Sequence, residues 1–277
     1  MKMCKFTFQI KATKKGVLTP FTGPQIQALF LNIIAKQDKQ LAEKLHQENI
    51  LRPYAVQPLK PLQGKKKIIE EKWIIEEGQQ YSFTISTLTE ELTKTMIEIL
   101  AEIQQIEIGK IPFDVLQVQI ESKTYETLLK ESFAAPKIQM EFLTPTHFRW
   151  KEAETYLPFP LPHLFYTNLA RIWNMFHPYK ADLGELKIWT IKNVYVKSFK
   201  GGTREIQIKG TKQTGYKGKI EYIIKNPERG YAKWATILTK YAEYTNVGAH
   251  RTQGMGVVKT DMQETKKSRQ ITIQLLN

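Results

Sequence analysis

Histidine is the side chain best suited to proton transfer near neutral pH. The five histidines of this sequence are His46, His147, His163, His177 and His250. Leu41 and Leu45 take the core face of a short predicted helix, so His46 is expected to turn outward near the helix end. Arg52 follows six residues later, and Tyr54 comes two residues after it. This spacing brings a cation and a phenol within loop reach of the imidazole, although an isolated surface histidine is most often only solvated.

These residue types suit the cleavage of RNA without a metal ion. The 2′-OH of RNA can attack the adjacent phosphorus, so a protein need supply only a base, an acid for the leaving 5′-oxygen and a cation for the phosphate. The sequence shows no compact carboxylate motif, zinc motif, P-loop, dinucleotide-binding fingerprint or nucleophile elbow. The adjacent pairs Glu70–Glu71 and Glu90–Glu91 are interpreted as solvated faces. Any nuclease chemistry here is therefore predicted to be metal-free, and no cofactor is expected.

The other histidines have simpler interpretations. His147 lies beside Phe148 and close to Trp150, so a structural role is expected. His163 and His177 flank an apolar helix and are interpreted as caps or core-edge residues. His250 is predicted to contact a phosphate or a base rather than to catalyse.

His250 belongs to a glycine-rich stretch at residues 246–258. Three glycines bracket a polar core, and glycine allows backbone amides to approach a ligand closely. A row of outward amides beside histidine and arginine would face a phosphate. Glycine-rich turns of this kind more often only connect a helix to a strand and bind no ligand. The predicted RNA-binding residues of this stretch are Gly248, His250, Arg251, Thr252, Gly254 and Gly256.

A second basic segment spans residues 197–219 and contains seven lysines or arginines but only one acid, Glu205. Its predicted RNA-binding residues are Lys200, Arg204, Lys209, Lys212 and Lys217. Interleaved glycines predict basic hairpins, with Phe199 and Tyr216 available to stack on bases. A solvated charged face is the plain alternative, but the segment leads toward the glycine-rich stretch and favours contact with an RNA backbone.

Composition supports an anionic partner. The chain has 277 residues, of which 42% are hydrophobic, so two globular domains are expected. Its net charge is +14, which suggests an anionic partner. Nucleic acid is the first candidate partner and an acidic membrane surface the second, while an ordinary basic enzyme stays open. Cys4 is the single cysteine, which excludes an internal disulfide and fits a reducing compartment. The N-terminus lacks a signal peptide and no apolar run spans a bilayer, so a cytoplasmic location is expected.

The first half predicts one complete fold. Its expected elements are a strand at 3–11, a helix from Pro24, a short helix capped by Asp38, strands at 54–60, 66–75 and 81–85, a helix that begins with a capping box at 87–90, and strands at 106–110 and 114–121. The order of strand, helix, strands, helix and strand is that of a ferredoxin-like (RRM-like) fold with inserted pieces.

The second half repeats this order after a polar boundary near 121–130. Its expected elements are a strand at 138–143, a helix from 161 to 176, strands at 187–199, 204–209 and 216–224, a helix at 231–245, and strands at 256–261 and 269–276. The predicted fold class is α+β, with two tandem ferredoxin-like domains. Domain 1–125 would carry His46, and domain 126–277 would carry the basic hairpins and the glycine-rich stretch.

Three motifs resemble a known family, the CRISPR-associated endoribonucleases that cut repeat RNA into guide RNAs. They are the glycine-rich stretch at 247–256, the segment at 141–149 with the following Pro158-Phe-Pro-Leu-Pro162 and a helix that ends Ala170-Arg-Ile-Trp-Asn174, and Leu41-Ala-Glu-Lys-Leu-His46 before an extended segment. The resemblance covers nearly the whole chain. It implies two ferredoxin-like domains and metal-independent cleavage that leaves a 2′,3′-cyclic phosphate and a 5′-hydroxyl.

The resemblance also implies site residues and partners. The family's catalytic histidine falls on His46, and a basic partner used by some members falls on Arg52. The tyrosine that some members carry on the first helix corresponds to Leu31, which leaves a third catalytic role open, with Tyr54 as a candidate. The implied partners are CRISPR repeat RNA and, as an open possibility, subunits of a CRISPR effector complex, for a monomer or a homodimer. Two alternatives stay open: a non-cleaving RNA-binding subunit of such a complex, and an unrelated tandem-RRM protein of RNA maturation.

Overall fold

A computed structural model describes residues 2–47, 51–150, 154–228 and 230–262. These residues form two compact units. The first unit holds the chain up to Lys123 together with Ile206–Gln213 and His250–Met255. The second holds the described residues of Thr124–Glu205 and Thr214–Ala249, together with those from Gly256 to Met262.

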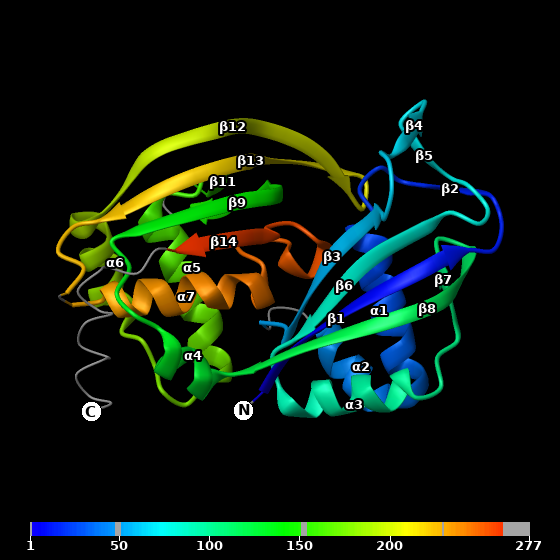
Figure 1. The fold of residues 1–277 in the computed structure, drawn as a ribbon, viewed down its shortest axis with the longest axis horizontal. Helices are drawn as coiled ribbons and strands as arrows, with labels where there is room; N and C mark the ends of the chain where they lie inside the picture. The colour runs from blue at the N-terminus through cyan, green and yellow to red at the C-terminus, as the bar shows by residue number, and fades with distance from the viewer. Residues whose placement is uncertain (1, 48–50, 151–153, 229, 263–277) are drawn as a thin grey trace, which may run out of the picture. The chain divides into compact units, whose positions relative to one another are not determined.

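The first unit contains most of the elements of the first half of the chain (Figure 1). They are β1 (Lys2–Ala12), β2 (Gly16–Leu18), α1 (Gly23–Gln37), α2 (Lys39–His46), β3 (Tyr54–Pro61), β4 (Lys67–Ile69), β5 (Lys72–Ile75), β6 (Gln80–Thr87), α3 (Glu90–Leu100), β7 (Gln105–Ile108) and β8 (Ile111–Thr124). The 3₁₀ turn η2 (Arg251–Gln253) also belongs to this unit.

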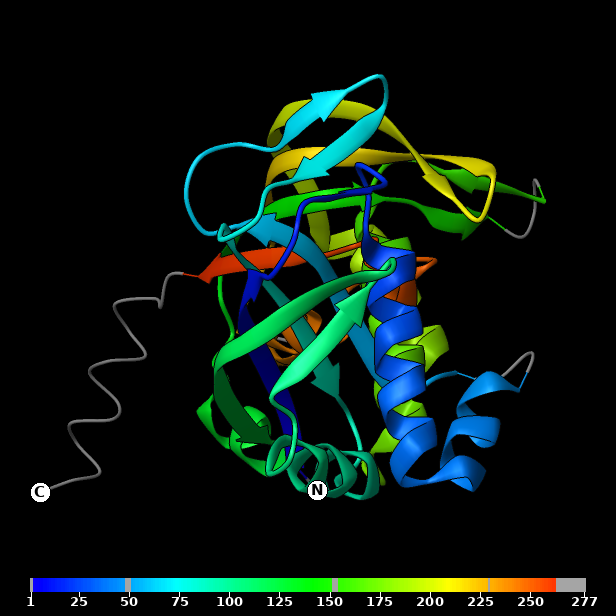
Figure 2. The same cartoon turned by 90° about the vertical axis from the view of Figure 1, so that its right-hand side faces the viewer.

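The main sheet of the first unit has the strand order β3-β6-β1-β8-β7. The strands β1, β3, β6 and β8 with the helices α1 and α3 form a ferredoxin-like fold, to which β7 adds an edge strand. Alternation along β1 places Phe6 and Phe8 in the core, where Phe8 stacks on Phe83 with ring centroids 4.7 Å apart. Helices α1 and α3 lie against one face of this sheet (Figures 1 and 2).

The start of α1 and the cap of α2 are confirmed. Pro24 stands in the first turn of α1, where its missing amide costs nothing. The Asp38 carboxylate accepts a hydrogen bond of 2.9 Å from the amide of Leu41 and so caps α2. These two helices carry the segment that ends in His46.

The second unit repeats the fold. Its elements are α4 (Tyr125–Glu131), β9 (Lys137–Thr146), β10 (Phe148–Trp150), β11 (Thr155–Leu157), α5 (Pro162–Phe176), α6 (Leu183–Asn193), β12 (Val194–Ile208) as far as Glu205, β13 (Thr211–Ile224) from Thr214, α7 (Ala232–Thr245) and β14 (Val258–Met262). Its sheet has the order β12-β13-β9-β14, which matches β3-β6-β1-β8 of the first unit. Helices α5 and α7 lie on one face of the sheet (Figure 1).

The strand predicted at 187–199 is wrong over its first half. Residues Leu183–Asn193 form the helix α6, and only from Val194 does the chain continue as β12. The Asp182 carboxylate caps α6 by accepting from the amide of Glu185, and Leu186 and Thr190 are buried one helical turn apart. Ile188 and Ile191 stay exposed on the same helix, so the apolar run that suggested a strand does not follow the buried face.

Two smaller predictions also differ from the structure. The strand expected at 66–75 is a hairpin, because Glu70 and Glu71 take positive φ values of 47° and 57° and form a two-residue turn between β4 and β5. The capping box at 87–90 is absent, since Thr89 is the N-cap of α3 and the Thr87 hydroxyl pairs with that of Thr93 at 2.6 Å. The strand expected at 269–276 lies outside the described residues.

Candidate active site

His46 is the last residue of α2. Leu41, Ala42 and Leu45 of this short helix are buried, whereas His46 is exposed. The helix therefore presents the imidazole to solvent, as its apolar spacing predicts. An exposed imidazole at a helix end can reach a bound polymer without displacing protein atoms.

Arg52 is tied to the same helix end. Its Nε donates a hydrogen bond of 2.9 Å to the carbonyl of Leu45, the residue before His46. That carbonyl belongs to the last turn of α2, where backbone acceptors lack partners within the helix. The bond holds the half-buried Arg52 side chain beside the backbone that carries His46. A cation and an imidazole are thus anchored on one short stretch of chain.

Tyr54 belongs to the core and does not fill the open third role. Its side chain is fully buried, its hydroxyl accepts a hydrogen bond of 3.1 Å from Gln27, and its ring lies 4.6 Å from that of Phe30. Burial raises the pKa of the Tyr54 phenol, while the bond from Gln27 and the charge of Arg52 oppose that rise. Leu31, which corresponds to a tyrosine in some members of the resembling family, is also buried.

The glycine-rich stretch does not present the expected row of amides. Gly248 donates to the side chain of Asn168, Gly254 to the carbonyl of Arg251, and Gly256 to the carbonyl of Pro145. All three glycines are buried, so the prediction of outward amides is wrong at these positions. RNA contact by this stretch stays a prediction for the side chain of His250, which is half-buried and lies 2.9 Å from the side chain of Gln253.

Arg251 and Thr252 are buried in the first unit. Arg251 Nη1 donates to the carbonyl of Tyr54 at 2.8 Å, and Nη2 donates to the carbonyl of Arg52. The Thr252 hydroxyl accepts from Gln27 at 3.2 Å. The same unit therefore contains the predicted catalytic pair and the centre of the glycine-rich stretch.

The structural roles expected for His147 and His177 are confirmed. His147 is buried, its Nδ1 lies 3.0 Å from the carbonyl of Thr214, and its ring stacks on Tyr156. His177 is the C-cap of α5 and stacks on Tyr125. His163 stands in the first turn of α5 and is half-buried.

The basic segment forms one long hairpin, β12–β13, rather than several. Lys209 and Gly210 make its turn, both with positive φ. The predicted RNA-binding side chains Lys200, Arg204, Lys209, Lys212 and Lys217 are all exposed. Phe199 is 61% exposed and can stack on a base. Tyr216 cannot, because it is buried and donates to the carbonyl of Lys219, so its predicted stacking role is wrong.

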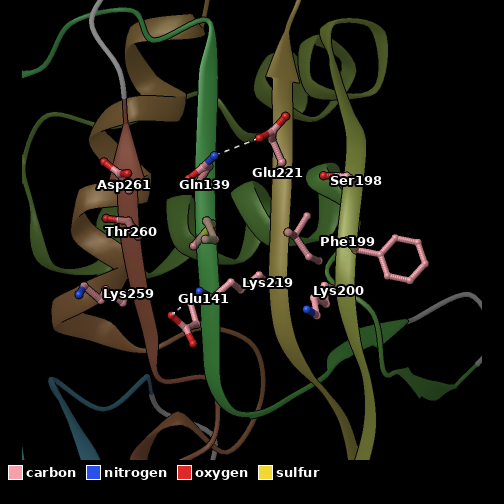
Figure 3. Close-up of a pocket in the computed structure, with 12 residues that line it drawn as sticks. Gln139, Glu141, Ser198, Phe199, Lys200, Lys219, Glu221, Lys259, Thr260 and Asp261 are labelled. Atoms are coloured by element: carbon pink, nitrogen blue, oxygen red, sulfur yellow. Dashed lines mark hydrogen bonds and ion pairs between the residues drawn. The ribbon is translucent and has the colours of Figure 1, made fainter.

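Glu221 organises a network of charges that the sequence did not predict. It lines a groove of about 490 Å³ on the sheet of the second unit, with residues from β9, β12, β13 and β14 (Figure 3). Lys137 lies 2.6 Å and Lys197 3.0 Å from the Glu221 carboxylate, and Gln139 donates to it at 3.0 Å. The hydrogen bond from Lys137 is the main cause that lowers the pKa of Glu221 to about 2, followed by those from Gln139 and Lys197. The carboxylate therefore stays ionised and holds two lysines in place.

Replacing Glu221 with glutamine is expected to remove a pH-dependent part of the stability. The pKa of Glu221 falls from 4.5 to about 2 on folding, so its contribution is complete above pH 4.5 and disappears as the pH falls toward 2. The stability difference between wild type and Glu221→Gln should shrink over that interval. Urea unfolding at a series of pH values measures it, with Glu107→Gln, an exposed carboxylate of β7, as control. A difference that does not change with pH would contradict the assignment.

Two further properties concern the described residues only. Within residues 2–47, 51–150, 154–228 and 230–262, no three His, Cys, Asp or Glu side chains lie close enough together to hold a metal ion. In the same part of the chain, no helix is both long and apolar enough to cross a membrane.

Comparison with solved structures supports the fold. A Cas6 product complex superposes with a TM-score of 0.74 at 22% identity, over 94% of this chain and 100% of that chain. Thermus thermophilus Cas6 gives a TM-score of 0.69 at 19% identity, over 94% and 98%. A Cas6-related protein of Pyrococcus furiosus gives 0.64 at 13% identity, over 96% and 100%. These likenesses show the same fold.

Family models cover most of the sequence. The model of the Cas6 N-terminal domain matches residues 10–130, and the model of the CRISPR-associated endoribonuclease Cas6 matches residues 140–258. None of the curated protein sequences that were compared matches the chain. The two family models together span far more than half of the 277 residues. The chain therefore belongs to the family of CRISPR-associated Cas6 endoribonucleases, which process precursor CRISPR RNA.

Proposed function

We propose that this chain cleaves CRISPR precursor RNA within its repeats and needs no metal ion to do so. The observation that carries the proposal is the exposed His46 at the end of α2, with Arg52 hydrogen-bonded to the preceding carbonyl, in a chain of an endoribonuclease family. Histidine exchanges protons near neutral pH, and arginine stabilises the charge that develops on a phosphate.

The proposed reaction is an internal transfer within the RNA. The 2′-oxygen loses its proton and forms a bond to the adjacent phosphorus, while the bond from phosphorus to the 5′-oxygen breaks and that oxygen gains a proton. His46 serves as the general base or the general acid for one of these two transfers. Arg52 stabilises the crowded phosphorane. The products are a 2′,3′-cyclic phosphate and a 5′-hydroxyl.

Binding is proposed to depend on the exposed side chains of the β12–β13 hairpin, together with His250 of the glycine-rich stretch. The similar solved structures include a Cas6 substrate mimic complex and a RAMP protein described as binding different RNA substrates, which supports RNA as the ligand class here. Phe199 offers a stacking surface beside Lys200 on β12.

The salt dependence of binding tests the hairpin. Lys200→Ala and Lys217→Ala should each weaken binding of repeat RNA and lower the slope of log K against log salt by about 0.7–0.9, because each would remove one phosphate contact. Fluorescence anisotropy over a salt series measures the slope. Lys94→Ala, which removes an exposed lysine of α3, is the control and should leave the slope unchanged. An unchanged slope in both hairpin variants would exclude these phosphate contacts.

End chemistry tests the reaction itself. Purified protein in excess EDTA should cut end-labelled repeat RNA, and the downstream fragment should accept phosphate from a polynucleotide kinase without prior dephosphorylation. The 3′ end of the upstream fragment should resist ligation until its cyclic phosphate is opened and the resulting phosphate is removed to leave a 3′-hydroxyl. Binding without cutting would favour a non-cleaving RNA-binding subunit. Cutting only when a divalent ion is added would contradict the metal-free mechanism.

A further inference from the structure

Arg251 is the first residue of η2 and is only 6% exposed. Its guanidinium bridges the backbone at the start of β3, with Nη1 donating to the carbonyl of Tyr54 and Nη2 to the carbonyl of Arg52. Hydrogen bonds from a charged donor are about twice as strong as neutral ones, and the planar fork of arginine suits two acceptors at once. The residue therefore fixes the backbone on both sides of Pro53.

The turn that carries Arg251 is itself held in place. Gln27 of α1 donates to the Thr252 hydroxyl at 3.2 Å and to the Tyr54 hydroxyl at 3.1 Å. A Cβ at Gly254 would lie 2.9 Å from the ring of Pro58, so the loop packs closely against β3. These contacts all lie within the first unit. They make η2 a brace on the start of β3.

The brace continues to the proposed catalytic pair. Arg251 holds the carbonyl of Arg52, and the side chain of Arg52 in turn donates to the carbonyl of Leu45, next to His46. Arg52 is thus fixed at its backbone by one partner and at its guanidinium by another. If the first contact is lost, the half-buried segment at 51–53 can shift and carry the Arg52 guanidinium away from the end of α2.

We infer that Arg251 is a positioning residue for cleavage, which sets the placement of Arg52 beside His46 and does not itself touch the RNA. This inference rests on the proposed function of His46 and Arg52. It differs from the role that the sequence suggested for Arg251, direct RNA contact, and the two roles predict opposite kinetics. An RNA contact contributes to affinity, whereas a positioning contact contributes to the rate in the bound complex.

Single-turnover kinetics at saturating repeat RNA separate the two roles. Arg251→Met should lower the cleavage rate about 10–100-fold, because misplacement of a catalytic group by about 1 Å can cost as much as 10²-fold. The dissociation constant and its salt slope should stay at wild-type values. Arg251→Lys keeps the charge but loses the forked guanidinium, so its cleavage rate should lie between those of wild type and Arg251→Met. Weaker binding with an unchanged rate at saturation would overturn the inference in favour of RNA contact.

A double-mutant cycle excludes a merely structural effect. If Arg251 acts through Arg52, Arg251→Met should slow cleavage much less in an Arg52→Ala background than in wild type. If the double variant instead slows cleavage by the product of the two single-variant factors, the two residues act independently and the inference is wrong. Thermal unfolding shows whether Arg251→Met folds, and if it does not, the same cycle is run with Arg251→Lys.

Hydrogen exchange keeps this test separate from the proposed function. Peptides that cover residues 51–56 should exchange faster in Arg251→Met or Arg251→Lys than in wild type, whether or not the protein cuts RNA. Unchanged exchange in these peptides would show that Arg251 does not hold the backbone at the start of β3. If the wild-type protein binds repeat RNA without cutting it, while the Arg251 variants still exchange faster at residues 51–56, the proposed function is wrong and the contact of Arg251 with this segment stands.

Discussion

Replacing His46 with alanine is expected to lower the cleavage rate of repeat RNA by about 10²–10⁴-fold, the usual contribution of a general acid or base. Affinity for the RNA should not change, because His46 is one exposed side chain at the end of a helix whose core contacts come from Leu41, Ala42 and Leu45. Single-turnover cleavage with excess enzyme measures the rate, and anisotropy measures binding. The substitution removes no buried contact, so the fold should be preserved.

Lys44→Ala is the matched control for this experiment. Lys44 is an exposed residue of the same helix and should be replaceable without effect on the rate. If His46→Ala cuts as fast as the Lys44→Ala control, His46 is not the proton-transfer group. His250 would then be the next residue to replace, because it is the half-buried histidine of the glycine-rich stretch in the same unit.

The second large effect is expected at Gly256. Its φ is +71°, and an added Cβ would lie 1.8 Å from the carbonyl oxygen and 2.7 Å from the nitrogen of Val247. Both neighbours are backbone atoms, and Val247 and Gly256 are already joined by a hydrogen bond of 2.9 Å. Gly256→Ala should therefore destabilise the protein by about 2–5 kcal/mol, from a left-handed backbone and an overpacked contact together.

Gly64→Ala separates these two causes. Gly64 has nearly the same φ, +73°, but among the described residues no atom would lie within 4 Å of a Cβ added there. Its replacement should cost only the conformational part, about 1–2 kcal/mol. Urea unfolding of both variants gives the comparison. Equal losses of stability would show that the close approach of Gly256 to Val247 does not govern that turn.

Much of the fold was predictable because its signals are local. Alternation along 3–11 and the apolar stripe after Pro24 reflect which side chains face the core, and Asp38 can be identified as a cap from its place before a helix. The prediction failed at 187–193, where Ile188 and Ile191 face solvent on α6. A strand pattern and a helix pattern cannot be separated there by hydrophobicity, since the apolar residues do not follow the buried face.

The candidate site, too, could be predicted from the sequence only in part. The outward turn of His46 follows from Leu41 and Leu45 on the same helix, so it could be predicted. The contacts of Arg251 join residues 197 and 199 positions apart in the chain, and no local pattern carries such information. A basic residue between glycines therefore suggested an RNA contact, whereas the structure shows a guanidinium bound to backbone carbonyls. Tyr216 was misjudged for a related reason, because aromatic residues in a basic segment can face either side of a strand.

The central claim is that the RNA supplies its own nucleophile. The most direct test compares wild-type cleavage of all-ribose repeat RNA with that of the same RNA carrying a single 2′-deoxy nucleotide at the scission site, both in excess EDTA. The expected result is equal binding of the two RNAs, with rapid cutting of the first and none of the second at that position. Cleavage of the 2′-deoxy RNA at a comparable rate would contradict the mechanism, because a nucleophile other than the 2′-oxygen would then attack the phosphorus.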